Sequence, residues 1–187
     1  MNKQELRCAV FEKNAALGEQ EKKLSDKAIA ERLLALREYE NANCIFTYIG
    51  VGDEVMTDAI TENLFSEGKR VCVPFCHGKG IMDAVEISSK EELVPGKYNI
   101  PEPRDISHTV APESLDLVIV PGVAFGEDGS RLGRGGGYYD RFLKACSNAK
   151  KIALCREINI RETVPREKHD EFVDIIVTEK RVIRKER

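Results

Sequence analysis

The chain has 187 residues, of which 42% are hydrophobic and 33% are charged, so it is long enough to bury a substantial core. Its formal net charge of -3 excludes the strongly basic character typical of nucleic-acid binders, and no apolar stretch approaches the roughly 20 residues that span a bilayer. The charged N-terminus lacks the apolar region of a signal peptide, so we expect a cytoplasmic protein whose six cysteines remain free thiols.

The first half of the chain is predicted to alternate helices with short strands. In chain order, the predicted elements are a helix over 2–17, a helix from about 24, a strand over 44–49, a helix from 57 or 58 to 68, and a strand over 71–73. Ser25 or Asp26 is placed to cap the second helix, because both residue types are good N-caps. Pro74 is expected to close the last of these strands.

The second half begins with a less regular passage, in which prolines between 95 and 112 predict loops. The elements predicted there are a strand over 84–87, a strand over 117–120, a helix from about 138 to 146, and strands over 151–154 and 175–177. Several strands are apolar on both faces and alternate with helices. That pattern predicts one α/β domain over 1–187, with a three-layer, mostly parallel, Rossmann-like open sheet and helices on both faces.

The segment Gly133–Gly137 is the most informative in the chain, because four of its five residues are glycines. Glycine permits positive φ, so backbone N–H groups can converge on an anion, and the N-terminus of the following helix would point at the same place. Arg131, Arg134 and Arg141 add fork-shaped donors suited to phosphate, and Asp140 is a candidate ligand for Mg²⁺. These residues together predict a phosphate-handling loop.

Other interpretations of the glycine segment are a flexible hairpin or a helix-entry loop. It is not a Walker A loop, because no G-x-x-x-x-G-K-[ST] pattern occurs. It is also a poor dinucleotide-binding fingerprint, since its glycine spacing is wrong and it lies about a dozen residues beyond the strand at 117–120. Cys72, Cys76 and His77 fall short of the paired spacing that structural zinc requires.

With these residues in view, the chain resembles the 5-formyltetrahydrofolate cyclo-ligase family. The strongest part is the run 117–125 leading into 132–141, and the stretches 3–7, 52–57 and 164–179 agree with it. The resemblance implies an ATP- and Mg²⁺-dependent closure of 5-formyltetrahydrofolate to 5,10-methenyltetrahydrofolate with release of ADP and phosphate. It implies attack of the formyl oxygen on the γ-phosphate, followed by attack of the neighbouring folate nitrogen on the activated carbon.

The resemblance also implies roles for individual residues. The implied ATP-binding residues are Lys3, Arg7, Arg131, Gly133, Arg134, Gly135, Gly136, Gly137, Tyr138, Tyr139, Asp140 and Arg141. The implied catalytic residues are Arg134, Tyr138 and Asp140, the implied folate-binding residues are Val51, Glu54, Met56 and Tyr138, and the implied metal ligands are Asp140 and Asp170. Met56, Phe75 and Arg156 depart from the family pattern, which affects the folate side more than the ATP side.

Some residues also have structural interpretations. From the sequence alone, a solvated helix face is the better explanation of Lys3 and Arg7, and a place in the core explains Tyr138 nearly as well. Two rival functions remain open: a sugar-phosphate isomerase or sugar-phosphate-binding regulator on a related sheet, and a non-catalytic folate- or nucleotide-binding module. The expected partners are the small molecules ATP and 5-formyltetrahydrofolate, with no nucleic acid and no membrane. A monomer is expected, because no long apolar stripe remains for an interface.

Overall fold

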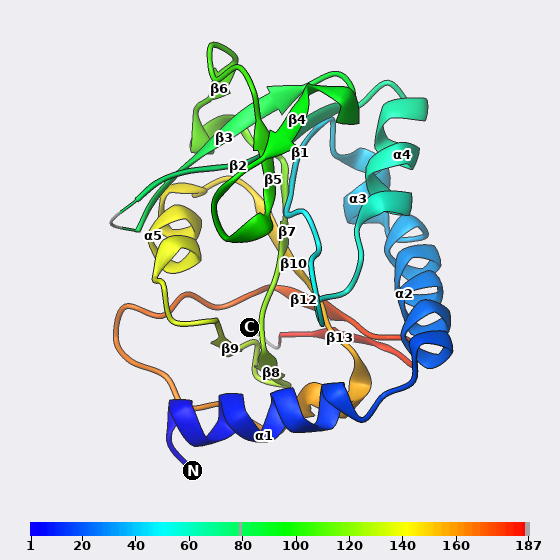
Figure 1. Cartoon of the computed structure of the whole chain (residues 1–187), viewed down its shortest axis with the longest axis vertical. Helices are drawn as coiled ribbons and strands as arrows, with labels where there is room; N and C mark the ends of the chain where they lie inside the picture. The colour runs from blue at the N-terminus through cyan, green and yellow to red at the C-terminus, as the bar shows by residue number, and fades with distance from the viewer. Residues whose placement is uncertain (79, 186–187) are drawn as a thin grey trace.

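The middle layer of the fold is an open sheet of eight strands, seen nearly edge-on in Figure 1. The structure, a computed structural model, describes residues 1–78 and 80–185. The strand order is β13 (Val182–Arg184), β12 (Ile175–Val177), β10 (Lys150–Leu154), β7 (Leu117–Val120), β1 (Cys44–Thr47), β2 (Arg70–Gly78), β3 (Ile81–Ile87) and β6 (Thr109–Val110). The five strands from β12 to β2 run parallel, whereas β13 pairs antiparallel with β12 at one edge and β3 pairs antiparallel with both β2 and β6 at the other.

The central strands are buried on both faces because apolar residues alternate between two cores. In β7, Leu117 and Ile119 point into one core, whereas Val118 and Val120 point into the other. The remaining parallel strands divide their residues in the same way. Continuous apolar runs are typical of parallel strands with both faces covered. The prediction of a mostly parallel sheet between helical layers is therefore confirmed.

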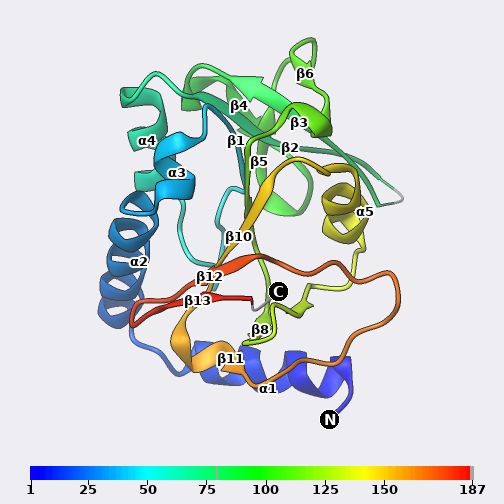
Figure 2. The same ribbon diagram turned by 180° about the vertical axis from the view of Figure 1, so that it is seen from behind.

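Helices cover the two faces unequally (Figures 1 and 2). On one face lie α2 (Glu19–Leu34), α3 (Arg37–Asn41) and α4 (Asp58–Ser66), which bury Ile29, Leu33, Tyr39, Ile60 and Leu64 against the sheet. On the other face lies α5 (Tyr138–Ala145), which buries Phe142 and Leu143. Among the described residues, no helix is long and apolar enough to cross a membrane.

The carboxyl ends of the parallel strands are closed by a smaller assembly. There the chain forms a three-stranded sheet in the order β11 (Ile160–Arg161), β8 (Ala124–Gly126) and β9 (Arg131–Leu132). Helix α1 (Lys3–Ala15) lies across this end and packs Leu6 and Val10 against Val123, Ala124, Leu132 and Val164. A separate hairpin of β4 (Leu93–Pro95) and β5 (Pro101–Pro103) lies near β2.

Two local predictions are wrong. Helix α2 begins at Glu19 with Gly18 as its N-cap, so Ser25 and Asp26 lie inside the helix and cap nothing. The acidic residues Glu19 and Glu21 in the first turn favour this earlier start, because they offset the positive end of the helix dipole.

Pro74 also fails to end its strand, since β2 continues to Gly78 in antiparallel pairing with β3. The parallel partner β1 pairs only with residues from Arg70 to Cys72. Beyond Cys72 the strand is therefore bonded on one side only. A proline without an N–H group is tolerated where the ladder is open.

Candidate functional site

A cavity of about 510 Å³ lies at the carboxyl ends of β1, β2 and β7. This is where ligands bind in open α/β sheets. Its lining residues are Tyr48, Ile49, Val51, Glu54, Pro74, Cys76, Met82, Lys97, Ile100, Pro101, Glu102, Pro121, Gly122, Arg131, Gly133, Arg134, Gly135, Gly136, Gly137, Tyr138, Tyr139 and Asp140. The predicted phosphate loop and three of the four predicted folate residues, Val51, Glu54 and Tyr138, therefore share one cavity.

The glycine loop reaches the cavity through a hairpin that follows β7. Strands β8 and β9 pair antiparallel and return the chain to the sheet edge, which explains the separation between β7 and the glycines. Gly135 has φ +105°, and Gly137, the N-cap of α5, has φ +68° in the left-handed region. Residues other than glycine rarely adopt these backbone angles. The N-terminus of α5 consequently opens onto the cavity, where it favours an anion.

Arg131 and Asp140 form a buried ion pair beneath the glycine loop. Arg131 Nη2 donates to Asp140 Oδ1 at 2.6 Å, and the side chains are only 3% and 17% exposed. Arg131 Nη1 donates to the Pro121 carbonyl at 3.4 Å, which ties the pair to the end of β7. Its Nε is buried and has no partner among the described residues. A buried donor costs free energy when unpaired, so this wall of the cavity suits an acceptor such as a phosphate oxygen.

Arg134 and Glu54 meet across the cavity, although the sequence assigned them to different ligands. Arg134 Nε donates to Glu54 Oε1 at 3.0 Å, and the backbone N–H of Val51 donates to Glu54 Oε2 at 3.1 Å. The Arg134 side chain is 53% exposed, whereas that of Glu54 is 14% exposed. The carboxylate is thus held in the wall, and the guanidinium extends into solvent.

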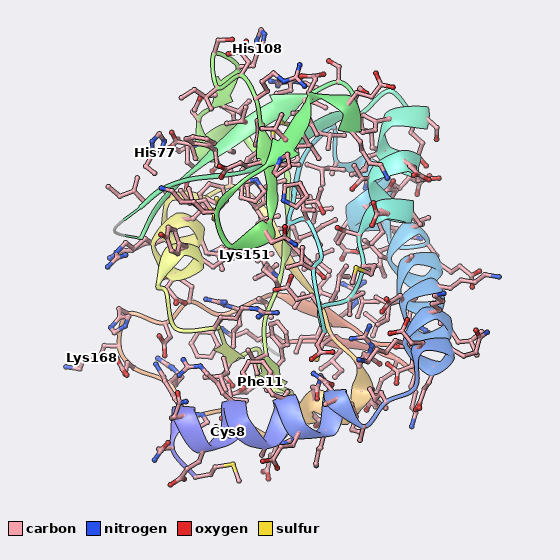
Figure 3. All side chains as sticks on the ribbon, in the orientation of Figure 1. Cys8, Phe11, His77, His108, Lys151 and Lys168 are labelled. Carbon is pink, nitrogen blue, oxygen red and sulfur yellow. The ribbon has the colours of Figure 1, made fainter. Side chains whose placement is uncertain are left out.

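Helix α1 contributes basic residues beside the glycine loop. Arg7 Nε donates to the Gly133 carbonyl at 2.8 Å, and its guanidinium lies alongside Gly135. Lys3 Nζ donates to Asp170 Oδ2 at 2.7 Å and pairs with Glu167 at 3.2 Å. Neither basic residue is simply a solvated side chain on an outer face. Cys8, by contrast, projects from the outer side of the helix, away from the sheet (Figure 3).

The two tyrosines of the loop differ in their surroundings. Tyr139 packs against both cores and meets the ring of Phe46 edge-on at 6.3 Å between centroids. Burial raises the pKa of Tyr139 well above its ordinary value, so its hydroxyl stays protonated. Tyr138 packs against one core only and is half-buried. Both tyrosines line the cavity, so each is placed to bound a ligand.

The two acids predicted as metal ligands, Asp140 and Asp170, are brought near each other by a hydrogen bond between Asp140 and the residue that follows Asp170. Asp140 Oδ1 accepts from Arg131 and also from the backbone N–H of Glu171 at 3.2 Å, next to Asp170. Burial alone would raise the pKa of Asp170, but hydrogen bonds from Lys3 and the Glu167 N–H hold it below its ordinary value. Asp170 is therefore a carboxylate at neutral pH. Mg²⁺ takes one or two carboxylates and completes its shell with water and phosphate oxygens, so this donor set fits the ion.

Two other predicted residues, Arg141 and Met56, lie at the edge of the site or outside it. Arg141 lies against Gly137 and Gly80, at the rim of the glycine loop. Met56 is outside the cavity lining, and its backbone N–H donates to Asp26 Oδ2 at 3.3 Å. Phe75 lies outside the lining as well.

Part of the cavity wall consists of residues that the sequence does not predict as site residues. Lys97, Ile100, Pro101 and Glu102, from the hairpin of β4 and β5, line one side. This segment was predicted only as loops, because its prolines mask any hydrophobic period. Cys76 also lines the cavity, and burial raises the pKa of its thiol, which therefore stays neutral. Pro121 and Gly122 were part of the recognised motif, but they were not assigned to the site.

The chain is similar to known proteins over most of its length. The chain is 31% identical to 5-formyltetrahydrofolate cyclo-ligase of Mus musculus over 95% of this chain and 93% of the relative. It is 30% identical to the Escherichia coli (strain K12) protein of the same name over 91% of this chain and 96% of the relative.

A solved structure of Aquifex aeolicus 5,10-methenyltetrahydrofolate synthetase superposes with a TM-score of 0.89 and is 33% identical, covering 100% of this chain and 94% of that chain. A 5,10-methenyltetrahydrofolate synthetase from Mycoplasma pneumoniae superposes with a TM-score of 0.78 at 25% identity, covering 96% and 99% of the two chains. Residues 1–179 match the sequence model of one family, and the chain therefore belongs to the 5-formyltetrahydrofolate cyclo-ligase family.

Proposed function

We propose that this enzyme closes 5-formyltetrahydrofolate to 5,10-methenyltetrahydrofolate and splits ATP to ADP and phosphate. The observation that carries the proposal is the position of Glu54 in the same cavity as the Gly133–Gly137 loop. A carboxylate accepts hydrogen bonds from the amino and ring N–H groups of a pterin, whereas the loop suits phosphates. One cavity therefore offers complementary walls to two substrates.

The proposed reaction needs positioning and charge neutralisation more than acid–base catalysis. The formyl oxygen attacks the γ-phosphorus, and ADP leaves. The neighbouring folate nitrogen then attacks the formyl carbon and loses its proton, and the phosphate departs with the former formyl oxygen. In this scheme Arg134 clamps the transferring phosphoryl group, Lys3 and Arg7 flank the nucleotide phosphates, and Tyr138 bounds the folate.

Asp140 and Asp170 would hold the magnesium ion of this reaction. When bound, Mg²⁺ supplies positive charge to the phosphate oxygens. The residues of the chain have their own tasks around it. Arg131 fixes the carboxylate of Asp140 through Oδ1, and Lys3 fixes that of Asp170, so each acid is oriented before any ligand arrives.

We also propose a monomer that works in the cytoplasm. The cavity wall is assembled from one chain, and the large exposed apolar residues, such as Phe11, Leu24 and Ile106, come from separate parts of it. The six cysteines are free thiols, as expected in a reducing compartment.

The test is an absorbance assay for methenyltetrahydrofolate with and without ATP and Mg²⁺, paired with an assay for ADP. We expect product only when ATP and Mg²⁺ are both present, with one ADP released per ring closed. Absence of ATP-dependent product would refute the proposal. Binding of both substrates without turnover would support a binding module, and conversion of a sugar phosphate would support the isomerase alternative.

A further inference from the structure

The 50–57 loop, which joins β1 to α4, carries Val51 and Glu54 into the cavity. Part of its shape is set locally, because Thr57 Oγ1 donates to the Tyr48 carbonyl at 2.7 Å and accepts from the Gly50 N–H at 3.2 Å. These bonds fasten the two ends of the loop. They do not hold its middle, where Glu54 lies.

Arg156, which follows β10 and is only 4% exposed, holds the middle of the loop together with Lys22 of α2, whose Nζ pairs with Asp53 Oδ1 at 2.8 Å. Arg156 Nη1 donates to the Asp53 carbonyl at 2.7 Å, and its Nη2 reaches the Glu54 carbonyl at 3.4 Å. One guanidinium thus serves two consecutive backbone carbonyls of the loop. A planar fork of donors suits such paired acceptors, and a lysine ammonium does not reproduce it.

Asp26 of α2 completes the arrangement. Its Oδ1 accepts from Arg156 Nη2 at 2.5 Å, and its Oδ2 accepts from the Met56 N–H at 3.3 Å. The Asp26 side chain is 14% exposed, so the ion pair lies largely out of water. Asp26 and Arg156 together bind the backbone of Asp53, Glu54 and Met56. They join α2, the end of β10 and the cavity loop at one point.

Neither member of this pair lines the main cavity. Arg156 touches the backbone of Glu54, and it is the carboxylate of Glu54 that faces the ligand space and receives Arg134. The pair can therefore act on a ligand in the main cavity by setting the position of Glu54. A displaced carboxylate loses charge-assisted hydrogen bonds to its ligand, and such a loss can weaken binding on the order of tenfold or more.

We propose that the Arg156–Asp26 ion pair is a positioning device that fixes the Glu54 carboxylate for the folate. The inference rests on the proposed function, in which Glu54 contacts the pterin. It assigns a role to Arg156, a residue that departs from the family pattern, and to Asp26, which the sequence indicated only as a helix cap.

The test compares Arg156→Met with the wild-type enzyme in steady-state kinetics. The KM for 5-formyltetrahydrofolate should rise roughly tenfold or more, whereas the KM for ATP and kcat should change by less than about threefold. The folate KM of Arg156→Lys should lie between those of the wild type and Arg156→Met, because lysine keeps the charge and loses the paired contacts. An unchanged folate KM in Arg156→Met would overturn the inference.

Two further variants separate positioning from stability. Arg156→Met leaves Asp26 buried without its partner, so the double variant with Asp26→Leu should recover melting temperature and still show the raised folate KM. Arg32 of α2 is the matched control, because its Nη1 also donates to two backbone carbonyls, those of Thr178 and Glu179, away from the cavity. Arg32→Met should lower the melting temperature with no change in folate KM. Equal kinetic effects in Arg32→Met and Arg156→Met would overturn the inference.

Hydrogen exchange distinguishes failure of this inference from failure of the proposed function. If the wild-type enzyme closes no folate, the proposed function fails. The role of the Arg156–Asp26 ion pair is then tested by hydrogen exchange of the 50–57 loop. Faster exchange of the Met56 amide in Arg156→Met, with α5 unchanged, would support it. Unchanged exchange at Met56 would overturn it.

Discussion

The two arginine–carboxylate ion pairs in the cavity wall differ in burial, and this difference decides which residue is free to meet a substrate. Arg131 and Asp140 are both largely buried, so separating them would leave a charge without its partner at a cost of about 3–5 kcal/mol. Arg134 is half exposed, and an ion pair of that kind contributes only about 0–1 kcal/mol. Arg134 can therefore leave Glu54 for a phosphate at little cost, whereas Arg131 serves as a fixed support.

Substitution of Arg134 should separate catalysis from stability. In Arg134→Ala we expect ATP-dependent turnover to fall on the order of 100-fold or more, because a donor to the transferring phosphoryl group is removed. The free energy of unfolding should change by less than about 1 kcal/mol. Steady-state kinetics and urea denaturation measure the two effects. Arg131→Ala is the comparison variant, and its free energy of unfolding should fall by about 3–5 kcal/mol. Unchanged turnover with a collapsed melting temperature would assign Arg134 a structural role instead.

Gly137 should be intolerant of a β-carbon for conformational reasons rather than for lack of space. Its φ is +68°, and an added Cβ would meet the Arg141 guanidinium at an ordinary 3.5 Å. Gly137→Ala should therefore cost roughly 1–2 kcal/mol in free energy of unfolding, measured by urea denaturation. Gly137→Asn places a similar Cβ there but tolerates the left-handed region better, so it should cost less. Equal losses in the two variants would contradict this explanation.

At the scale of elements, the central strands could be predicted because their apolar runs have one explanation, burial on both faces. The start of α2 could not be predicted so well. The helix begins at a glycine cap that makes no side-chain hydrogen bond, whereas Asp26 has the residue type of a cap and instead binds Arg156. The hairpin of β4 and β5 was missed because its prolines give no periodic signal. Its place in the cavity wall depends on contacts distant in sequence.

The attachment of α1 should depend on pH through Asp170. Burial opposes ionisation of Asp170, but the hydrogen bonds from Lys3 and the Glu167 N–H outweigh it and lower the pKa. Burial also opposes the charge on Lys3, but Asp170 and Glu167 raise its pKa. The raised pKa of Lys3 and the lowered pKa of Asp170 both favour the charged pair. A lowered carboxyl pKa contributes stability above the unfolded value of 3.8 and loses it as the pH falls through the folded value.

Asp170→Asn isolates this contribution. The difference in free energy of unfolding between wild type and Asp170→Asn should be largest near neutral pH and should vanish in acid, below the folded pKa. Urea denaturation at a series of pH values from neutral into acid measures it. Hydrogen exchange of the α1 amides should follow the same profile. A difference that is constant over this range would show that Asp170 acts through packing rather than charge.

At the scale of the whole molecule, the candidate site joins residues as distant as Lys3 and Asp170. The glycine loop and its place at a sheet edge could be predicted, because glycines, arginines and a strand end are local signals. The pairing of Arg134 with Glu54, and of Arg156 with Asp26, could not. Each pair is separated by many residues, and each charged residue alone is explained equally well by a solvated surface.

Because the site ties both ends of the chain to the sheet, we expect one cooperative unfolding transition and a response of the whole fold to its ligands. Ligand at 100 times its dissociation constant stabilises the native state by about 2.7 kcal/mol, which corresponds to roughly 5–11 °C in melting temperature for a chain of this size. Calorimetry with and without ATP, Mg²⁺ and 5-formyltetrahydrofolate measures the shift. The Arg156→Met variant should keep the shift caused by ATP and lose most of the shift caused by the folate. Two separate transitions, or a ligand shift confined to one of them, would contradict a single folding unit, because the sheet from β13 to β6 would then not melt as one.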